Sequence, residues 1–327
     1  MRARYQRAAT TRSVLAALIG DLLVAATKTF AAFFTGSAAM LSEAVHSFVD
    51  STNEVLLLYG IHRAARKPDV AHPFGHGREI YFWSFVVSLL IFALGAGVSI
   101  FQGVGRILHP VAIESPVVSY IVLGLAFLFE GSSWAVAVRQ FSRMKGELGF
   151  FDAVRLSKDP PSFMTFLADS VAMLGLAIAA LTTYLAGALE RPDIDGMGSV
   201  AIGVLLAATS LFLARESKSL LIGEQAYPSV RKSILEIANH HTGCVKANGL
   251  FTAQLGPDQI VAMLSVEFAD GLRAPQIEDT IISLEKKVRE ANPEVVALFI
   301  KPQTAKTFQD QLSNLQDGED GDGSGTA

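Results

Sequence analysis

Two side chains that commonly bind divalent metal ions lie one helical turn apart in an apolar stretch of this sequence. His46 and Asp50 are four positions apart, which places an imidazole and a carboxylate on the same face of a helix. Such a pair can occupy two corners of a tetrahedral metal site. A buried His-Asp hydrogen bond that fixes helix packing is the alternative. Because an ionisable side chain inside a membrane span costs about 2.5 to 3.5 kcal/mol, we favour metal binding.

A hydroxyl and a carboxylate repeat this spacing further along the chain, at Thr165 and Asp169. Asp169 is a strong metal ligand and Thr165 a weak one, although Asp169 could instead cap the start of a helix. His46, Asp50 and Asp169 would leave a fourth coordination position for Thr165 or a water molecule. An open position suits a carrier, which must release its metal, better than a closed structural site.

The composition indicates that most of this chain lies in a membrane. Of its 327 residues, 50% are apolar and only 18% are charged, whereas soluble domains carry about 25% charged residues. This composition excludes an ordinary cytosolic enzyme, and we predict that the protein is not an enzyme. A membrane span needs about 20 mostly apolar residues. Six windows fit, at residues 13–34, 38–61, 80–105, 117–138, 164–187 and 196–214.

Lys and Arg are distributed unevenly over the segments that connect these windows. The N-terminal segment and the segments 62–79 and 139–158 carry thirteen of them, and the opposite connections carry two, Arg106 and Arg191. Because positively charged connections stay on the cytoplasmic side, we predict that both termini are cytoplasmic. No secretory signal or other presequence precedes the first window, which favours a bacterial inner membrane.

The predicted domain boundaries follow from this pattern. Residues 1–12 are expected to form a cytoplasmic N-terminus and residues 13–215 a transmembrane domain of six helices. Residues 216–306 have mixed charge, and their hydrophobic periodicity predicts helices at about 228–241 and 274–291 and strands at about 245–255, 259–269 and 295–301. This αββαβ order predicts a small cytoplasmic α+β domain of ferredoxin-like type. The acidic, glycine-rich tail at 307–327 is expected to be disordered.

Several other classes of protein are excluded by the residues present. Cys244 is the only cysteine, so neither a disulfide framework nor a thiolate-built zinc site can form within one chain. Any metal must therefore be bound by imidazole and carboxylate groups. The 27 Lys and Arg residues are scattered at a net charge of −4, which argues against a nucleic-acid partner. The sequence has no G-x-x-x-x-G-K-[ST] motif, so nothing indicates a nucleotide-driven pump.

Two motifs resemble those of the cation diffusion facilitator family. They are GSAAMLSEAVHSFVD at residues 36–50 and HPFGHGRE at residues 72–79, and the similarity covers roughly residues 10–302. Runs similar to the branch of the family that includes vertebrate zinc transporter nine lie at residues 158–160, 167–170 and 215–224. The resemblance implies a homodimeric secondary transporter that exports Zn²⁺ or a similar divalent ion from the cytoplasm in exchange for protons.

The resemblance also implies which residues bind the transported ion. The family builds its transport site from two residues, four apart, on each of the second and fifth spans. By position these correspond to His46, Asp50, Thr165 and Asp169. Thr165 is a departure, because many members of the family have His or Asp there.

A second metal site is implied at the cytoplasmic edge of the membrane. It corresponds to Asp69, His72 and His76, for which a solvated loop is the alternative. Some members of the family also bind metal in the cytoplasmic domain through several histidines. The strands expected at residues 262–268 and 295–300 contain none, so we assign this domain to dimerisation.

The chemistry of such a site is sufficient for antiport. Metal binding requires a neutral imidazole and ionised carboxylates, so metal and protons exclude one another. A single histidine favours Zn²⁺, with Fe²⁺, Mn²⁺ or Co²⁺ as alternatives. The metal is then a transported substrate, and we expect no tightly bound cofactor. A non-transporting partner subunit or metal-responsive scaffold is the second hypothesis, and an electroneutral carrier for an organic solute is the third.

Overall fold

The computed structural model describes residues 22–111, 116–146 and 148–321, and it divides the chain into two compact units. The first, which we call the helical unit, combines the described residues up to Ala65 with Glu79–Lys218. The second, the sheet unit, combines Arg66–Arg78 with the described residues from Ser219 onward. Residues 66–78 therefore belong with the C-terminal domain, although the sequence had placed them in the transmembrane domain.

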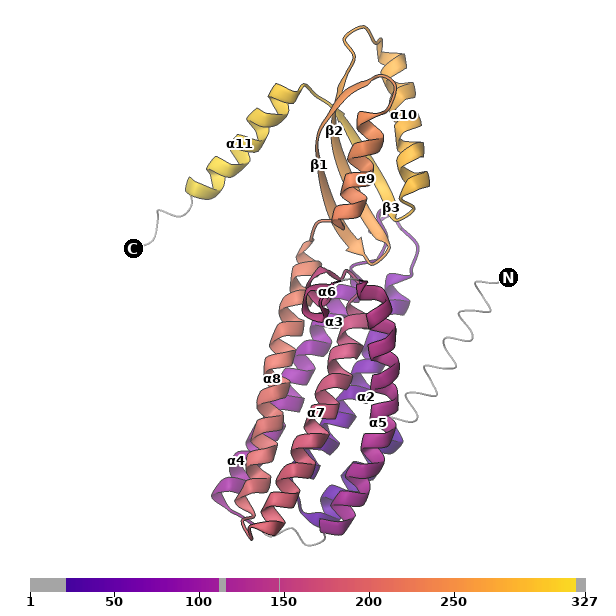
Figure 1. The fold of residues 1–327 in the computed structure, drawn as a ribbon. Coiled ribbons are helices and arrows are strands. Elements are labelled where there is room, and N and C mark those ends of the chain that lie inside the picture. Colours follow the sequence, from indigo (N-terminus) through magenta and orange to yellow (C-terminus); the bar gives the residue numbers. More distant parts are fainter. Residues whose placement is uncertain (1–21, 112–115, 147, 322–327) are drawn as a thin grey trace, which may run out of the picture. The chain divides into compact units, whose positions relative to one another are not determined.

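The helical unit is a bundle whose long helices run side by side (Figure 1). Its elements are the helix Leu22–Thr35, α2 (Ala38–Ala64), α3 (Glu79–Leu90), η1 (Ile91–Ala96), α4 (Gly97–Leu108), α5 (Pro116–Lys145), α6 (Phe150–Leu156), α7 (Pro160–Ala188) and α8 (Asp193–Ile222). The π-helical turn η1 joins α3 and α4 into one apolar helix of 30 residues.

Four of these helices are long and apolar enough to cross a membrane. They are Glu79–Leu108, Ser119–Arg143, Pro160–Ala188 and Asp193–Ile222, and they coincide with the last four of the six predicted windows. In the described part of the first window, Leu22–Thr35 is a shorter apolar helix, and residues 13–21 lie outside the description. The second window is the helix α2, which is more polar because it contains Glu43, Asp50 and Glu54.

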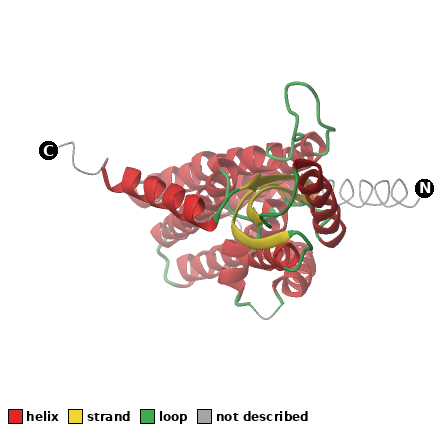
Figure 2. Ribbon diagram, turned by 90° about the horizontal axis from the view of Figure 1, so that it is seen from above, coloured by secondary structure: helices red, strands yellow, loops and turns green. Residues whose placement is uncertain are grey.

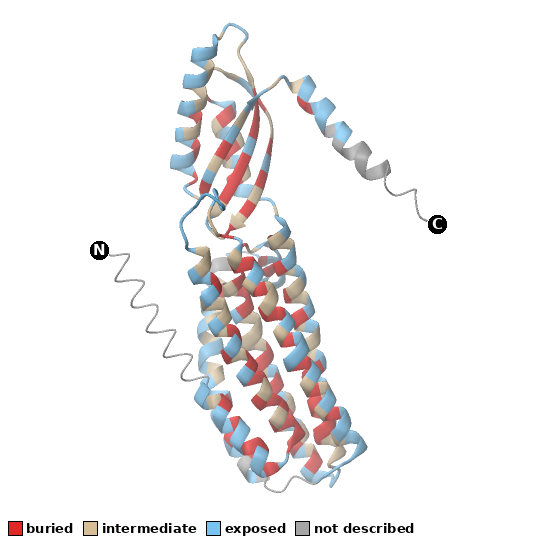
Figure 3. Ribbon diagram, turned by 180° about the vertical axis from the view of Figure 1, so that it is seen from behind, coloured by how far each residue is buried: buried red, intermediate tan, exposed pale blue. Residues whose placement is uncertain are grey.

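Small residues let two of the helices approach closely. A Cβ atom added to Gly103 in α4 would lie 2.6 Å from the carbonyl oxygen of Gly196 in α8, and the reverse contact would be 2.8 Å. Glycine at such contacts is common in membrane bundles, where packing rather than burial from water holds helices together. The buried residues accordingly gather on the inner sides of the helices (Figure 3).

The beginning of α2 is fixed to the beginning of α8. Ser37 is the N-cap of α2, and its hydroxyl accepts a hydrogen bond from the backbone of Met40 at 3.2 Å. The same hydroxyl donates to Asp195 of α8 at 2.7 Å, and the backbone N–H of Ala38 donates to that carboxylate at 2.6 Å. Asp195 is completely buried, so this bond network sets the position of α2 inside the bundle.

The sheet unit has the predicted αββαβ order, with one further helix. Its elements are α9 (Pro228–Asn239), β1 (Cys244–Gly256), β2 (Gln259–Phe268), α10 (Ala274–Ala291), β3 (Val295–Pro302) and α11 (Ala305–Gly321). The strands, which are yellow in Figure 2, form a three-stranded mixed sheet. Their order in the sheet is β1-β2-β3. β1 pairs antiparallel with β2, and β2 pairs parallel with β3.

The two faces of this sheet differ in burial. Alternate residues of β2, from Ile260 to Val266, are at most 1% exposed and pack against α9 and α10. This confirms the predicted alternation along the strand. On the opposite face, Phe251, Met263 and Phe299 are neighbours across the three strands and are 45%, 46% and 53% exposed.

The tail that was expected to be disordered begins with a helix. α11 extends to Gly321, and residues 322–327 lie outside the description. Composition indicated disorder, but Phe308 supplies an apolar anchor that is only 6% exposed. Its ring covers Gly249 of β1, where an added Cβ atom would lie 2.2 Å from the ring.

Candidate metal sites

The predicted pair on α2 is present with the expected spacing. His46 Nε2 lies 3.3 Å from Asp50 Oδ2. This is close to the edge of a tetrahedron built on metal bonds of about 2.1 Å, which is roughly 3.4 Å. The contact is not directed as a hydrogen bond, and the His46 imidazole is 97% buried. The distance between the two groups is compatible with two ligands of one ion.

A small cavity inside the bundle collects most of the predicted transport residues. Its volume is about 40 Å³, and 10–15 Å³ of such volume holds about one water molecule. Asp50 from α2 and Thr165 and Asp169 from α7 all line it. A partly hydrated divalent ion fits a space of this size and charge.

Of the four predicted transport residues, His46 is the one that does not line the cavity. It lies one turn earlier on α2 than Asp50, packed in the interior of the bundle. His46, Asp50 and Asp169 consequently do not form a group whose ligand atoms all lie within 4.8 Å of one another. In this conformation the cavity presents oxygen ligands, and the imidazole lies beside Asp50 just beyond them.

The cavity also contains polar residues that the sequence did not single out. Asn53 and Glu54 line it from α2. Ser133 of α5 donates a hydrogen bond to Asp169 Oδ2 at 3.3 Å. The sequence does contain a signal for Asn53 and Glu54. Together with Asp50 and Leu57, they follow the i, i+3, i+4, i+7 spacing of one helix face.

The remaining walls of the cavity are apolar and come from α2, α3, η1, α7 and α8. They consist of Leu57, Val87, Ile91, Met164, Ala168 and Leu213. Ile91 is the first residue of the π-helical turn η1, and such turns are frequent at functional sites. Apolar walls keep the local dielectric low, which strengthens the attraction between the carboxylates and a bound cation.

A second polar cluster in the bundle was not predicted as a unit. Lys28 is completely buried, and its Nζ donates hydrogen bonds to Glu43 at 3.0 Å, Ser47 at 2.9 Å and Glu130 at 2.6 Å. We call these four residues the Lys28 cluster. It joins three helices, namely Leu22–Thr35, α2 and α5. The ammonium group satisfies carboxylates that would otherwise be costly inside an apolar bundle.

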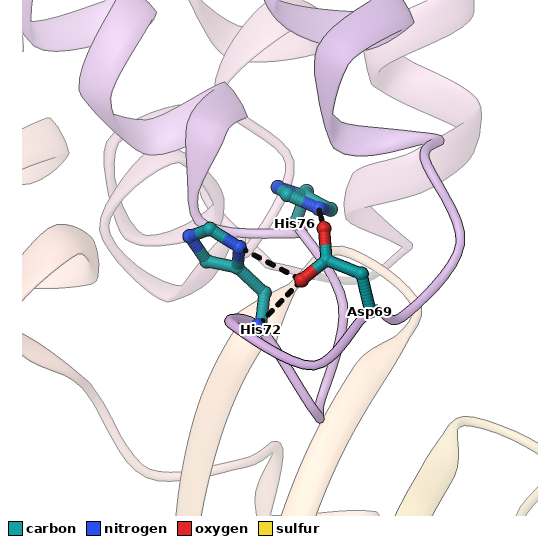
Figure 4. A group of neighbouring side chains, drawn as sticks. All are labelled: Asp69, His72 and His76. Atoms are coloured by element: carbon teal, nitrogen blue, oxygen red, sulfur yellow. Dashed lines mark hydrogen bonds and ion pairs between the residues drawn. The ribbon is translucent and has the colours of Figure 1, made fainter.

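The second predicted metal site is assembled in the sheet unit. Asp69 Oδ1 lies 3.2 Å from His72 Nδ1, and Asp69 Oδ2 lies 3.1 Å from His76 Nε2 (Figure 4). Among the described residues, these three are the group whose ligand atoms all lie within 4.8 Å of one another. The two imidazole rings face each other with centroids 4.2 Å apart, and both point toward the carboxylate.

The loop backbone holds this group in place. The backbone N–H of His72 donates to Asp69 Oδ1 at 2.7 Å, and the N–H of Gly75 donates to the His72 carbonyl at 2.9 Å. Gly75 adopts φ +88°, which a residue with a side chain rarely adopts. The hydrogen bond from the His72 backbone lowers the pKa of Asp69 to about 2, so this ligand is ionised at neutral pH.

The loop is packed on the strands of its own unit. A Cβ atom added to Gly77 would lie 2.6 Å from the Leu255 carbonyl oxygen at the end of β1. The ring of Phe74 contacts that of Phe299 edge to face at 6.2 Å. Three exposed or half-buried ligands are therefore held by a loop that is anchored at two points.

Comparison with known proteins identifies the family. The family model for the cation efflux transmembrane domain matches residues 14–222. This protein belongs to the cation efflux, or cation diffusion facilitator, family. The family proteins that it resembles are transporters, not enzymes, and the predicted membership is confirmed.

Individual members of the cation efflux family match different shares of the chain. The mitochondrial proton-coupled zinc antiporter SLC30A9 of Xenopus laevis is 34% identical over 244 residues, which are 74% of this chain and 44% of that protein. The metal tolerance protein C4 of Arabidopsis thaliana is 33% identical over 215 residues, 65% of this chain and 47% of that one. This chain thus spans less than half the length of both relatives.

A bacterial member of the family matches the chain over nearly its whole length. The cation-efflux pump FieF of Cronobacter sakazakii is 26% identical over 281 residues, which are 84% of this chain and 88% of that protein. Family membership and four helices that are long and apolar enough to cross a membrane indicate an integral membrane protein.

Proposed function

We propose that this protein exports Zn²⁺ from the cytoplasm in exchange for protons. The observation that carries the proposal is the cavity in which Asp50 of α2 and Asp169 of α7 meet inside an apolar bundle. Carboxylates from two different helices can bind an ion that neither helix holds alone. The names of the relatives, a proton-coupled zinc antiporter and a cation-efflux pump, support the same activity.

Coupling follows from competition between metal and protons at this site. Asp50 and Asp169 bind metal only when ionised, and His46 binds it only when its ring is neutral. Protons that reach the site from the outer face displace the metal, and metal from the cytoplasmic face displaces protons. If the bundle changes its open side only when loaded, an inward proton gradient drives metal outward.

The imidazole of His46 favours Zn²⁺ as the transported metal. Imidazole suits Zn²⁺, Fe²⁺ and Co²⁺, whereas a site made only of oxygen ligands suits Mn²⁺ or Mg²⁺. His46 lies 3.3 Å from Asp50, so a rotation of either side chain would let both bind one ion. Fe²⁺, Mn²⁺ and Co²⁺ remain the alternatives to be compared.

Metal-dependent proton movement in proteoliposomes tests the proposal. The purified full chain is reconstituted with a pH-sensitive dye inside, and Zn²⁺, Fe²⁺, Mn²⁺ and Co²⁺ are added in turn. We expect proton flux with Zn²⁺ that is lost in Asp50→Ala. Glu190→Gln, an exposed change outside the cavity, is the matched control and should keep the flux.

One observation favours a different function. Because Thr165 replaces a stronger ligand and His46 lies outside the cavity wall, the chain has the features expected of a non-transporting partner subunit. If folded, dimeric protein moves protons with none of the four metals, this result would support the partner-subunit function and refute the antiporter proposal.

We also propose six membrane spans, with both termini in the cytoplasm of a bacterium and the α+β domain, of ferredoxin-like type, on that side. The near full-length match to a bacterial pump and the basic segments 62–79 and 139–158 support this arrangement.

Cys244, the single cysteine, offers a test of this topology, because it lies in the sheet unit. Burial raises the pKa of its thiol and slows labelling at neutral pH, so the reaction is allowed to run to completion. An impermeant maleimide should label inside-out vesicles and spare right-side-out ones.

We propose that the sheet unit forms a homodimer through its open face. The exposed row of Phe251, Met263 and Phe299 is an apolar surface that a second copy of the chain can cover. Met263→Asp should convert the detergent-solubilised protein to a monomer in light scattering. Ile282→Asp, at an exposed position of α10, is the control and should leave the dimer intact.

We propose that Asp69, His72 and His76 bind a second metal ion of the same kind. Their spacing supports this, and a fourth ligand would come from water. His72→Ala should remove one equivalent of bound Zn²⁺ in a titration of the full chain. A stoichiometry equal to that of the wild type would show that the loop is only a solvated turn.

A further inference from the structure

The cavity extends past the predicted ligands along one face of α2. Asp50, Asn53, Glu54 and Leu57 all line it, at the spacing of a single helix face. One helical turn is about 5.4 Å, so Glu54 lies about that far from Asp50 toward the end of α2. Thr165 also lines the cavity, one turn nearer the start of α7 than Asp169.

The amide of Asn53 on this part of α2 is poorly explained by folding alone. Asn53 is 95% buried, and neither its Nδ2 nor its Oδ1 has a hydrogen-bond partner among the described residues. A buried amide without partners costs about 1 to 3 kcal/mol. Its position on the cavity wall supplies the missing partner, because a water molecule or hydrated ion in the cavity can bond to both atoms.

The chemistry of this end of the cavity differs from that of the other end. Glu54, Asn53 and Thr165 offer a carboxylate, an amide and a hydroxyl, and all of these ligate through oxygen. Oxygen ligands suit hard divalent cations that keep part of their water shell. His46, the soft nitrogen ligand, lies on the far side of Asp50.

We propose that Glu54 and Asn53 form an entry position that receives a hydrated divalent cation and passes it to Asp50 and Asp169. The inference rests on the proposed transport function and extends it to two residues outside the four-residue transport set. It also explains how the chain tolerates Thr165, because Glu54 returns a carboxylate to the same end of the cavity. The entry position sets the apparent affinity, and it favours Mn²⁺ over Zn²⁺ more than the deeper ligands do.

Two isosteric or small substitutions test this position, with a rescue and a matched control. Glu54→Gln removes the charge but keeps the shape, Asn53→Ala removes the amide, and Glu54→Asp restores a carboxylate. Glu190→Gln is the same chemical change at an exposed site outside the cavity. Initial rates of metal uptake by proteoliposomes are measured against Zn²⁺ and Mn²⁺ concentration, and thermal unfolding verifies that each variant is folded.

We expect Glu54→Gln to raise KM for Mn²⁺ about tenfold and to change kcat less than threefold, since altered groups beside metal ligands cost roughly 10- to 100-fold in affinity. KM for Zn²⁺ should rise by a smaller factor, and Glu54→Asp should recover most of the loss. The entry position would be refuted if Glu54→Gln and Asn53→Ala both had a KM within twofold of the wild type while Asp50→Ala was inactive. The transport proposal would stand after that result.

A binding measurement separates this inference from the transport proposal. Mn²⁺ bound to the full chain is quantified by electron paramagnetic resonance, in proteins that all carry His72→Ala to remove the loop ligand. Glu54→Gln should weaken Mn²⁺ binding about tenfold relative to that background. If Glu54→Gln weakens Mn²⁺ binding but the wild-type protein transports no metal, the entry position is supported and the transport proposal is refuted. Unchanged binding would refute the entry position itself.

Discussion

Two groups of acidic side chains lie in the same helical bundle, and they differ in how their charge is balanced. In the Lys28 cluster, Glu43 and Glu130 contact one ammonium group at 3.0 and 2.6 Å. In the cavity, Asp50 and Asp169 line a space of about 40 Å³ whose described walls contain no Lys or Arg. The Lys28 cluster contains its own cation, whereas the described cavity walls contain no Lys or Arg, which fits the proposed binding of a metal ion there.

This difference separates structure from function within one apolar environment. A buried ion pair whose members are all held by the chain fixes the position of three helices relative to one another. A cavity with carboxylates on two helices can be filled and emptied while the bundle stays folded. Substitutions in the Lys28 cluster should therefore affect stability first, and substitutions in the cavity should affect transport first.

The largest effect is expected for Lys28→Met. It leaves two carboxylates buried beside each other without their cation, and removing one partner of a buried pair costs about 3 to 5 kcal/mol. Titration with SDS should show this loss in the free energy of unfolding. The triple variant with Glu43→Gln and Glu130→Gln removes the charges together and should recover most of the stability. Equal stability of the single variant and the wild type would contradict a structural role.

Asp169→Asn should have the next largest effect, and it should fall on transport. The change removes a charged ligand of the cavity while keeping its shape, so we expect kcat/KM for Zn²⁺ to fall about 100-fold. The free energy of unfolding should stay within about 1 kcal/mol of the wild type. If the variant loses stability as much as Lys28→Met does, the two groups do not differ as described.

The local part of the site was predictable from sequence because helical spacing is regular. The four-residue separation of His46 and Asp50 predicted one helix face, and the two groups are 3.3 Å apart. The αββαβ order of the sheet unit followed from alternation in the strands and helical periodicity in α9 and α10. Both rest on contacts between residues that are near in sequence.

The parts that were missed depend on contacts between distant segments. Lys28 and Glu130 are 102 positions apart, so no periodicity connects them. The loop at 66–78 joins the sheet unit through packing of Gly77 against the end of β1, which has no local signal. Glu54 lies outside the four positions that the family resemblance implies, although it shares a helix face with Asp50.

His46→Gln should have an intermediate effect that refines the comparison. His46 lies beside Asp50 but outside the cavity wall, one turn from Asp50 in the direction of Glu43. We expect KM for Zn²⁺ to rise about tenfold, with a smaller change for Mn²⁺, because imidazole is the ligand that Zn²⁺ prefers. Metal-selective uptake assays measure this, and an equal change for both metals would place His46 among the structural residues.

Thr165→Ala should have the smallest effect. Thr165 lines the cavity, but a hydroxyl is a weak ligand and water can replace it. We expect KM for Zn²⁺ to change less than about threefold, as judged from uptake rates beside those of Asp169→Asn. A loss as large as that of Asp169→Asn would give the hydroxyl a direct part in coordination.

The route of the backbone between the two units has a mechanical consequence. The chain passes from one unit to the other after Ala65, returns after Arg78, and passes again after Lys218. Two of these three crossings are the ends of the loop 66–78, which is held on the strands by packing and not by a covalent bond. A single cut by a protease at Gly223–Tyr227 would therefore separate residues 228–327 covalently from the rest of the chain, and only the packing of residues 66–78 on the strands would hold the sheet unit together.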